Sequence, residues 1–349
     1  MAPRFVDAHV HLDKTLIWPR APNRHGGFEA AKALVKADRV AAWTVDDVAA
    51  RMDAALARAF ANGTRAMRTH IDSQEGRTEP AWTAFEAVRA AWRRRIEIEP
   101  AVSLGAGKLM GDYGETVARL AASRGAVLGP VLYPGPDIDA HIARAFDLAE
   151  RFGLDLDFHV DENLDPMSDG LARVARMRID RDFKSRVLCG HGCALALKPE
   201  AEIAATAASL REAEVDFVSL PQTNAFLLGR SDDAVPRLRA LPPLKSLLAA
   251  GVNAALASDN CQDPFNPAGD YNLVEIWRDA ALQAHLPAPF EPALAMIAGN
   301  AATALGLDAR GIAAGAPADL VVFEARDAAD LFARPATPRR ALVRGRPAA

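Results

Sequence analysis

Two histidines separated by one residue, His9 and His11, lie in a largely apolar run near the start of the chain, FVDAHVHLD. Alternate residues of a β-strand project from the same face, so a strand over Phe5–Leu12 sends both imidazoles in one direction. Two neutral imidazoles on one rigid strand make half of a transition-metal site. An ordinary pair of histidines in a hairpin or on a surface fits the same spacing, so the remaining ligands have to come from elsewhere.

Polar residues of metal-binding or proton-transferring types also follow other apolar runs. They are His70 and Asp72, then His159, Asp161 and Glu162, then His191, and finally Ser258, Asp259 and Asn260. Five of the eight histidines fall at such positions, and His25, His141 and His285 do not. Three imidazoles and a carboxylate, from His9, His11, His159 and Asp259, suit zinc or ferrous iron and leave a position for water. Because a divalent ion lowers the pKa of bound water toward neutrality, the set predicts metal-assisted hydrolysis.

Glu162 and His191 are candidate catalytic groups beside the metal. Glu162 is three residues from His159, so it reaches the same site only if the chain leaves strand geometry at Asp161. A carboxyl group there, not bound to metal, is suited to shuttle protons between water and substrate. His191 is suited to polarise the oxygen added to the substrate or to orient hydroxide. A helix cap or surface acid is the alternative for Glu162, and a buried, hydrogen-bonded histidine is the alternative for His191.

Eight apolar runs alternate with amphipathic helical patterns along the chain. The predicted strands are Phe5–Leu12, Arg65–Ile71, Glu97–Leu104, Val127–Tyr133, Leu154–Val160, Val187–Gly190, Asp216–Pro221 and Asn253–Ser258. Eight strand–helix units predict an α/β fold of the closed (β/α)₈, or TIM, barrel type, in which the strand ends meet at one mouth. An open doubly wound sheet alternates too, but it seldom reaches eight strands and usually carries a glycine-rich phosphate turn.

The connections add detail to this prediction. Residues 14–43 form a long excursion after the first strand, typical of a substrate lid. Thr44 and Gly63 are the predicted caps of one helix, and residues 291–307 are predicted to form another. We assign residues 1–308 to the barrel and residues 309–349 to a small β appendage.

The composition sets limits on partners and location. The chain has 349 residues, half of them apolar, and a net charge of −4, which gives no electrostatic reason to expect nucleic acid or an anionic membrane as partner. No run of about 18 apolar residues is present and the N-terminus lacks signal-peptide features, so a cytoplasmic protein is expected. Cys189, Cys193 and Cys261 are too few for a disulfide framework, and we expect them to serve packing.

The motifs HVH, HVDE, GHG and SDN, together with RTHID, PQTNAFLLGR and GIAAGAPADLVV, occur in an order that resembles the amidohydrolase superfamily, specifically its cytosine deaminase-like branch. The resemblance extends through nearly the whole chain. It implies one metal ion held by His9, His11, His159 and Asp259, with Glu162 protonating a ring nitrogen. It further implies that His191 lies beside the metal-bound water, that Asp259 takes a proton from that water, and that ammonia leaves.

Three departures from that branch concern the substrate and the appendage. Cytosine deaminases carry a glutamine after the third barrel strand, where this chain has Leu104–Lys108, and an aspartate where this chain has Asn260. Gln74, Lys108 and Gln222 are, with Asn260, the candidate substrate-binding residues. Superfamily members usually begin with strands that complete the appendage, whereas this chain is expected to begin at the first barrel strand. Either the appendage is therefore reduced here or the true N-terminus lies upstream.

The expected partner is a small heterocyclic substrate, in a protein that we expect to form homo-oligomers. Three alternatives stay open. A cyclic-amide hydrolase would usually carry a carboxylated lysine at the fourth strand, and VLGPVLYPG has none. A hydrolase that removes an alkylamine from a triazine-type ring would use the same residues. A metal-binding scaffold without activity would not need Glu162 or His191. We assign His70, Asp13 and Asp72 to residues that orient the ligands or shape the mouth.

Overall fold

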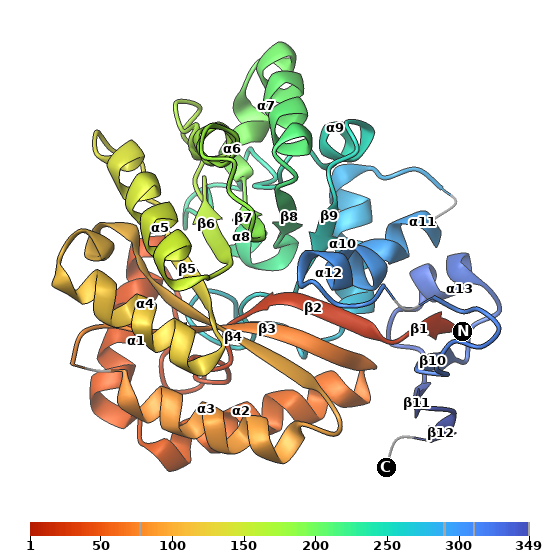
Figure 1. The fold of residues 1–349 in the computed structure, drawn as a ribbon. Helices are drawn as coiled ribbons and strands as arrows, with labels where there is room; N and C mark the ends of the chain where they lie inside the picture. The colour runs from red at the N-terminus through yellow and green to blue at the C-terminus, as the bar shows by residue number, and fades with distance from the viewer. Residues whose placement is uncertain (77, 289–290, 310, 348–349) are drawn as a thin grey trace.

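The computed structural model describes residues 1–76, 78–288, 291–309 and 311–347. Eight parallel strands form one sheet in chain order, surrounded by helices (Figure 1). The strands are β2 (Phe5–Val10), β3 (Thr64–Asp72), β4 (Glu97–Gly105), β5 (Val127–Val131), β6 (Leu156–Val160), β7 (Val187–His191), β8 (Asp216–Ser219) and β9 (Ala254–Leu256). A parallel bridge between Val10 and Asp259 joins the first strand to the last. The predicted (β/α)₈ barrel is therefore confirmed, with strand bounds within three residues of those expected.

Helices follow the strands as the amphipathic patterns predict. They are α1 (Phe28–Ala42), α2 (Val45–Ala61), α3 (Glu79–Trp92), α4 (Asp112–Arg124), α5 (Ile138–Phe152), α6 (Gly170–Asp180), α7 (Glu200–Glu212), α8 (Pro221–Leu227), α9 (Leu244–Ala249) and α10 (Leu273–Ala284), with short 3₁₀ helices η1 (Ala106–Met110) and η2 (Cys193–Leu197). Thr44 caps α2 by accepting a hydrogen bond from the N–H of Asp47 at 3.1 Å. The C-cap is Asn62 rather than Gly63, whose φ of +98° and close approach to Val321 require a glycine.

The single helix predicted over residues 291–307 is wrong. The segment divides into α11 (Glu291–Leu294), η3 (Ala295–Ile297) and α12 (Gly299–Ala304), with Ala298 outside helical geometry between them. The side chain of Asn300 donates to the carbonyl of Ala254 at 2.9 Å, and Asn253 donates to the carbonyl of Asn300 at 3.1 Å. These bonds to β9 and its start favour a break over one continuous helix.

The excursion over residues 14–43 is fixed to the barrel rather than extended into solvent. Its C-terminal part is α1, and the guanidinium of Arg20 pairs with Asp38 at 2.8 Å and with Asp47 at 2.6 Å. Arg51 donates to the carbonyl oxygens of Asp13 and Thr15 at 2.6 and 3.0 Å. The charged pairs hold this segment over the strand ends, where a cover of the site is expected.

A second, four-stranded antiparallel sheet forms the appendage, with helix α13 (Ala328–Ala333) beside it in Figure 1. Its strands are β1 (Ala2–Pro3), β10 (Leu320–Phe323), β11 (Arg339–Val343) and β12 (Arg346–Pro347). The chain thus supplies an N-terminal strand, β1, to this sheet, so the expectation that it begins at the first barrel strand is wrong. Of the segment assigned to the appendage, Arg310, Ala348 and Ala349 lie outside the described residues. Within the described ranges, no helix combines the length and apolar character that a membrane crossing needs.

The three cysteines are all buried free thiols, in keeping with the predicted packing role. Burial raises the pKa of each thiol. Cys261 directly follows the strand-end residues 258–260, and Cys193 begins η2 after β7.

Candidate active site

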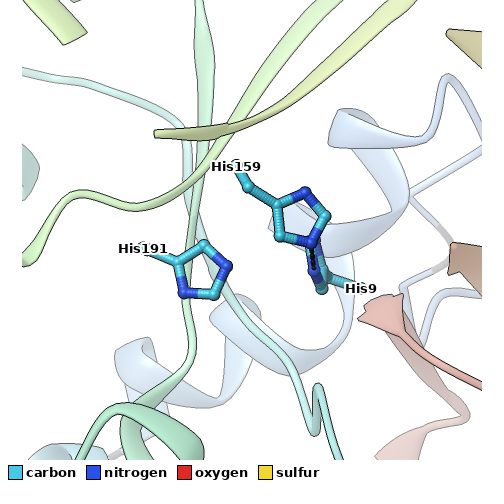
Figure 2. Close-up of side chains that lie close together, drawn as sticks. All are labelled: His9, His159 and His191. Atoms are coloured by element: carbon cyan, nitrogen blue, oxygen red, sulfur yellow. Dashed lines mark hydrogen bonds between the residues drawn. The ribbon is translucent and has the colours of Figure 1, made fainter. Parts of the chain in front are cut away.

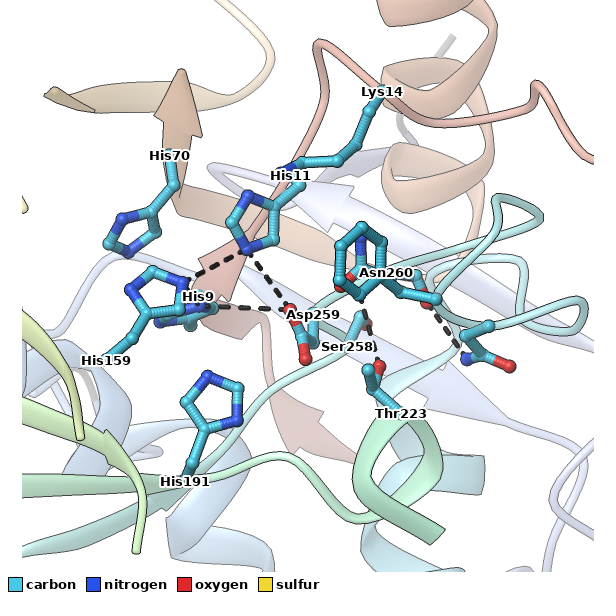
Figure 3. Close-up of polar contacts among 12 residues, drawn as sticks. His9, His11, Lys14, His70, His159, His191, Thr223, Ser258, Asp259 and Asn260 are labelled. Carbon is cyan, nitrogen blue, oxygen red and sulfur yellow. Dashed lines mark hydrogen bonds and ion pairs between the residues drawn. The ribbon is translucent and has the colours of Figure 1, made fainter. Parts of the chain in front are cut away.

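Four side chains from three parts of the barrel aim their donor atoms at one point. The Nε2 atom of His159 lies 3.2 Å from that of His9 and 3.3 Å from that of His11 (Figures 2 and 3). The Oδ1 atom of Asp259 lies 3.3 Å from Nε2 of His11 and 3.8 Å from Nε2 of His9. All four residues are buried. The structure thus brings together the four predicted ligands.

These separations are those expected around one ion. Donor atoms held tetrahedrally at zinc–imidazole bond lengths lie about 3.4 Å from one another. Burial, followed by the neighbouring imidazoles, keeps the pKa of His9 and of His159 well below the ordinary value, so both rings are neutral as ligands must be. Apart from the imidazoles of His9 and His11, no group among the described residues is a partner of the two buried carboxylate oxygens of Asp259, which is costly unless a cation binds there. The residues present therefore fit a divalent metal.

The main chain at the strand ends explains how the ligands converge. His9 belongs to β2, while His11 follows that strand, and Asp259 follows β9 with a left-handed φ of 57°. The N–H of Asp259 donates to the carbonyl of His9 at 2.9 Å, and the N–H of His11 donates to the carbonyl of Asp259 at 3.3 Å. Barrel closure and ligand placement are thus made by the same peptide groups.

A left-handed residue also brings Glu162 into the site. Asp161 has a φ of 52°, so the chain leaves strand geometry immediately after β6, as the spacing from His159 requires. The carboxylate of Asp161 accepts from the N–H groups of Gly170 and Leu171, each at 3.0 Å, at the start of α6. Burial, then the charge of Asp259, raises the pKa of Glu162 well above its ordinary value. The raised pKa favours the protonated carboxyl group, which is the form that can donate a proton.

His191, at the end of β7, is oriented by an asparagine that the sequence did not single out. The Nδ2 atom of Asn224, in α8, lies 3.1 Å from Nδ1 of His191 and 3.5 Å from Oε1 of Glu162. Because an amide nitrogen donates, Nδ1 of His191 accepts and the ring proton is on Nε2. That Nε2 atom is buried and has no hydrogen-bond partner within the described ranges, and burial lowers the pKa of His191 to about 4. A neutral His191 is thus available as a hydrogen-bond donor.

A group of buried charged side chains contacts the proposed ligands inside the barrel. Arg68 pairs with Asp157 at 2.8 Å, and Nε2 of His70 lies 3.4 Å from the same carboxylate. The ring of His70 packs on that of His9 with centroids 4.1 Å apart. The expected role of His70 in orienting a ligand stays a prediction, which this contact with His9 supports. Arg68 and Asp157 were missed, although each stands two residues before a site histidine and therefore faces the same side of its strand.

A cavity of about 340 Å³ opens in front of the ligands. It is lined by His11, His159, His191, Asp259 and Glu162, by Asn260 and Gln74 among the predicted substrate-binding residues, and by part of α1. The side chain of Asn260 donates to Asp263 at 2.6 Å. The volume lies at the lower end of the range for small-molecule sites, so one or two fused rings fit better than a polymer.

The other two candidate substrate-binding residues lie elsewhere. Lys108 is exposed on η1 and does not line the cavity. Gln222 lies in α8 and donates to Asp279 at 2.8 Å, also outside the cavity lining. Both residues are close to strand ends in the sequence but not in space, because Lys108 lies in the 3₁₀ helix η1 and Gln222 lies in α8, which place them away from the mouth.

A cluster of buried charges shapes the mouth beside the ligands. Asp72 pairs with Lys14 at 3.1 Å and with Arg39 of α1, and its N–H donates to Asp13 at 2.9 Å. Burial would raise the pKa of Asp72, but Lys14 and Arg39 hold it below its ordinary value. Asp72 lines the cavity, whereas Asp13 accepts from its N–H without lining the cavity, so the expected role of both in shaping the mouth stays a prediction. Nothing in the spacing pointed to Lys14 or Arg39.

Comparison with known proteins agrees with this arrangement. The amidohydrolase family model matches residues 25–349. A pterin deaminase of Rhizobium rhizogenes is 38% identical over 347 residues, which are 99% of this chain and 79% of that protein.

Solved structures of similar fold cover the whole barrel. A 5-methylcytosine deaminase from Klebsiella pneumoniae, liganded with 5-fluorocytosine, superposes with a TM-score of 0.90 at 26% identity, over 100% of this chain and 86% of that one. An N-isopropylammelide isopropylaminohydrolase from Burkholderia multivorans gives a TM-score of 0.83 at 24% identity, over 99% and 85% of the two chains. The chain belongs to the metal-dependent amidohydrolase family, in its deaminase-like branch, and is a hydrolase of carbon–nitrogen bonds.

Proposed function

We propose that the protein removes the exocyclic amine of an aminated N-heterocycle as ammonia, using one zinc or ferrous ion held by His9, His11, His159 and Asp259. The convergence of these four donor atoms, four of whose six pairs are separated by 3.2–3.8 Å, carries the proposal. When bound, such an ion acts as a Lewis acid that makes water nucleophilic at neutral pH. β5 ends in the cavity with Val131 and offers no bridging lysine, which favours one ion over two.

The chain's own residues supply the proton transfers. Water adds to the ring carbon that bears the amine, and Asp259 accepts a proton from it. Glu162 delivers its proton to the adjacent ring nitrogen, which makes that carbon electrophilic. The Nε2–H of His191 donates to the oxygen added to the carbon. Asp259 then gives the proton that it took from water to the amine, the carbon–nitrogen bond breaks and ammonia leaves. The proton of the added hydroxyl passes to Glu162 as the carbonyl forms, which restores both carboxyl groups.

A fused 2-amino-4-oxo ring of the pterin type is our first substrate choice, with cytosine-like pyrimidines second. The 38% identity to a pterin deaminase supports this order. So does the end of β4, where Leu104 and Gly105 line the cavity in place of the glutamine typical of cytosine deaminases. The shorter side chains leave more room for a second ring.

Ammonia release from a panel of rings tests the proposal. The protein is stripped of metal, reloaded with zinc or iron separately, and assayed with pterin, cytosine, an N-alkylamino triazine and a cyclic amide. We expect metal-dependent ammonia release from pterin or cytosine. Alkylamine release from the triazine alone would favour the dealkylating alternative, and ring opening of the cyclic amide the other one. Stoichiometric metal with no turnover on any ring would contradict the proposal and favour a scaffold.

A further inference from the structure

Helix α1 presents a stripe of cations to the cavity. Lys32, Lys36 and Arg39 are spaced four and three residues apart, and all three line the cavity, as does Lys14 from the segment after β2. Residues three and four apart lie on one face of a helix. None of these residues is a candidate metal ligand or proton donor, so the proposed chemistry does not explain them.

Lys32 is held in place at this wall. Its ammonium lies 4.7 Å from the centroid of the Tyr133 ring and 3.0 Å from the carboxylate of Glu29. Tyr133 and Glu29 also line the cavity. The charge of Lys32 is therefore partly compensated by the protein itself.

Two buried cations of the cavity wall share one carboxylate of the lining, while Asp13 and Asp263 attract Lys14 from outside the lining. Lys14 and Arg39 are 6% and 8% exposed, and both pair with one carboxylate, that of Asp72. Asp13 lies next to this group but does not line the cavity. The Nε atom of Arg39 is buried and has no hydrogen-bond partner in the described part of the chain. A buried donor without a partner is costly, so this wall is suited to an additional acceptor.

The charge of Lys36 is not paired with that of any described residue. It is exposed, and no described residue makes an ion pair or hydrogen bond with its ammonium. It stands one turn after Lys32, where two like charges on a helix destabilise each other. An anion bound between Lys36 and Arg39 would relieve this repulsion.

We infer that the substrate ring carries an anionic substituent, a carboxylate or a phosphate, which the α1 stripe binds through Lys36 and Arg39. This rests on the proposed function, because it assumes that a heterocycle occupies the cavity. A neutral ring could be bound by amides and backbone groups alone, whereas an unpaired lysine and an unpaired guanidinium N–H favour a negative charge. The stripe would also select against cationic rings.

The test compares matched substrates in matched variants. We measure kcat/KM for pterin, for the same ring bearing a carboxylate and for one bearing a phosphate ester, in wild type, Lys36→Gln, Lys36→Glu and the control Lys184→Gln. Lys184 is an exposed lysine that lies outside the cavity lining. We expect the preference of kcat/KM for a charged ring over pterin to fall about tenfold in Lys36→Gln, further in Lys36→Glu, and not in Lys184→Gln. Whichever charged ring, the carboxylate or the phosphate ester, has the larger wild-type kcat/KM relative to pterin identifies the anionic group that the site prefers.

Equilibrium binding to the metal-loaded protein, followed by calorimetry, gives a second readout that needs no turnover. Wild type should bind a charged ring more tightly than pterin, the difference should shrink as salt rises, and Lys36→Gln should lose it. Ammonia release without any preference for charged rings, or an unchanged preference in both Lys36 variants, would overturn this inference and leave the proposed function intact. If no ring is hydrolysed, the proposed function fails, and the binding difference alone decides for or against the anion site.

Discussion

The backbone of Asp259 is hydrogen-bonded to that of His9, with its N–H donating to the His9 carbonyl oxygen at 2.9 Å. The reciprocal bond from the N–H of His11 to the Asp259 carbonyl completes the bridge between β2 and β9. Three of the four donor atoms proposed to hold the metal thus come from residues at the one seam that joins the ends of the sheet. Metal binding and barrel closure must therefore stabilise each other.

Hydrogen exchange should detect this coupling. We expect the amides of His11 and Asp259 to exchange more slowly in the metal-loaded protein than in the stripped protein, because opening the seam separates the ligands. The amide of Phe146, within α5, serves as an internal control that should change least. Equal exchange at the seam with and without metal would contradict the coupling.

Replacing one ligand should remove the metal-dependent rise in melting temperature. Metal at about 100 times its Kd stabilises the folded wild type by about 2.7 kcal/mol. In His11→Ala we expect that stabilisation to be largely lost and less than one ion per chain to remain after dialysis. His25→Ala removes an exposed histidine and should behave as wild type. Full metal content in His11→Ala would remove His11 from the ligand set.

The proton-donor role of Glu162 can be separated from metal binding. Glu162→Gln keeps the shape of the side chain but cannot give up a proton, so kcat should fall by roughly 10²–10⁴. Metal content, measured by elemental analysis, should stay at the wild-type level. Turnover close to that of wild type would rule out the role.

Asn224 should matter through the two groups that it contacts. In Asn224→Ala, His191 loses the donor to its Nδ1 atom and can adopt the other tautomer, so we expect kcat to fall about 10- to 100-fold with a smaller change in KM. Gln222→Ala removes an amide from the same helix, α8, but outside the cavity. If both variants lose activity equally, the effect is one of helix stability rather than of positioning.

Asp263 should make the stability of the fold depend on pH. Burial raises its pKa from 3.8 to about 7, even though it accepts hydrogen bonds from Asn260 and from the N–H of Phe265. A raised pKa in the folded state means that its contribution to stability is fully present below pH 3.8 and is lost as pH rises through about 7.

Chemical denaturation at several pH values measures this effect. The free energy of unfolding of wild type relative to Asp263→Asn should fall by up to about 4 kcal/mol between pH 4 and 7 and stay constant above that range. The exposed Asp233→Asn should show no such trend. A flat difference for Asp263→Asn would show that the carboxyl is charged throughout.

The barrel and the candidate ligands could be predicted because both follow local rules. Alternation along β2 places His9 and His11, and a barrel brings strand ends to one mouth whatever lies between them. The departure from strand geometry at Asp161 could also be predicted, because Glu162 could not otherwise face the site. These expectations need only the period of a strand and the topology of the fold.

The other features of the site could not be predicted, because they depend on tertiary contacts that the spacing of residues in the sequence does not encode. Asn224 reaches His191 because α8 folds across the mouth, and Lys36 lines the cavity because α1 returns over it. Lys108 and Gln222 look close to the mouth in sequence but are carried away from it by η1 and α8. Ala2 and Pro3 are too short a strand to recognise until their partner β10 is known.

The buried thiols described above provide the protein with built-in reporters of its own opening. A protonated, inaccessible cysteine reacts slowly with alkylating reagents, so the intact fold should resist labelling while an opened one takes up mass. Cys261 adjoins the β2–β9 seam, and Cys193 adjoins the strand that carries His191. The order in which the two thiols are alkylated would therefore show which side of the barrel unfolds first, without any engineered probe.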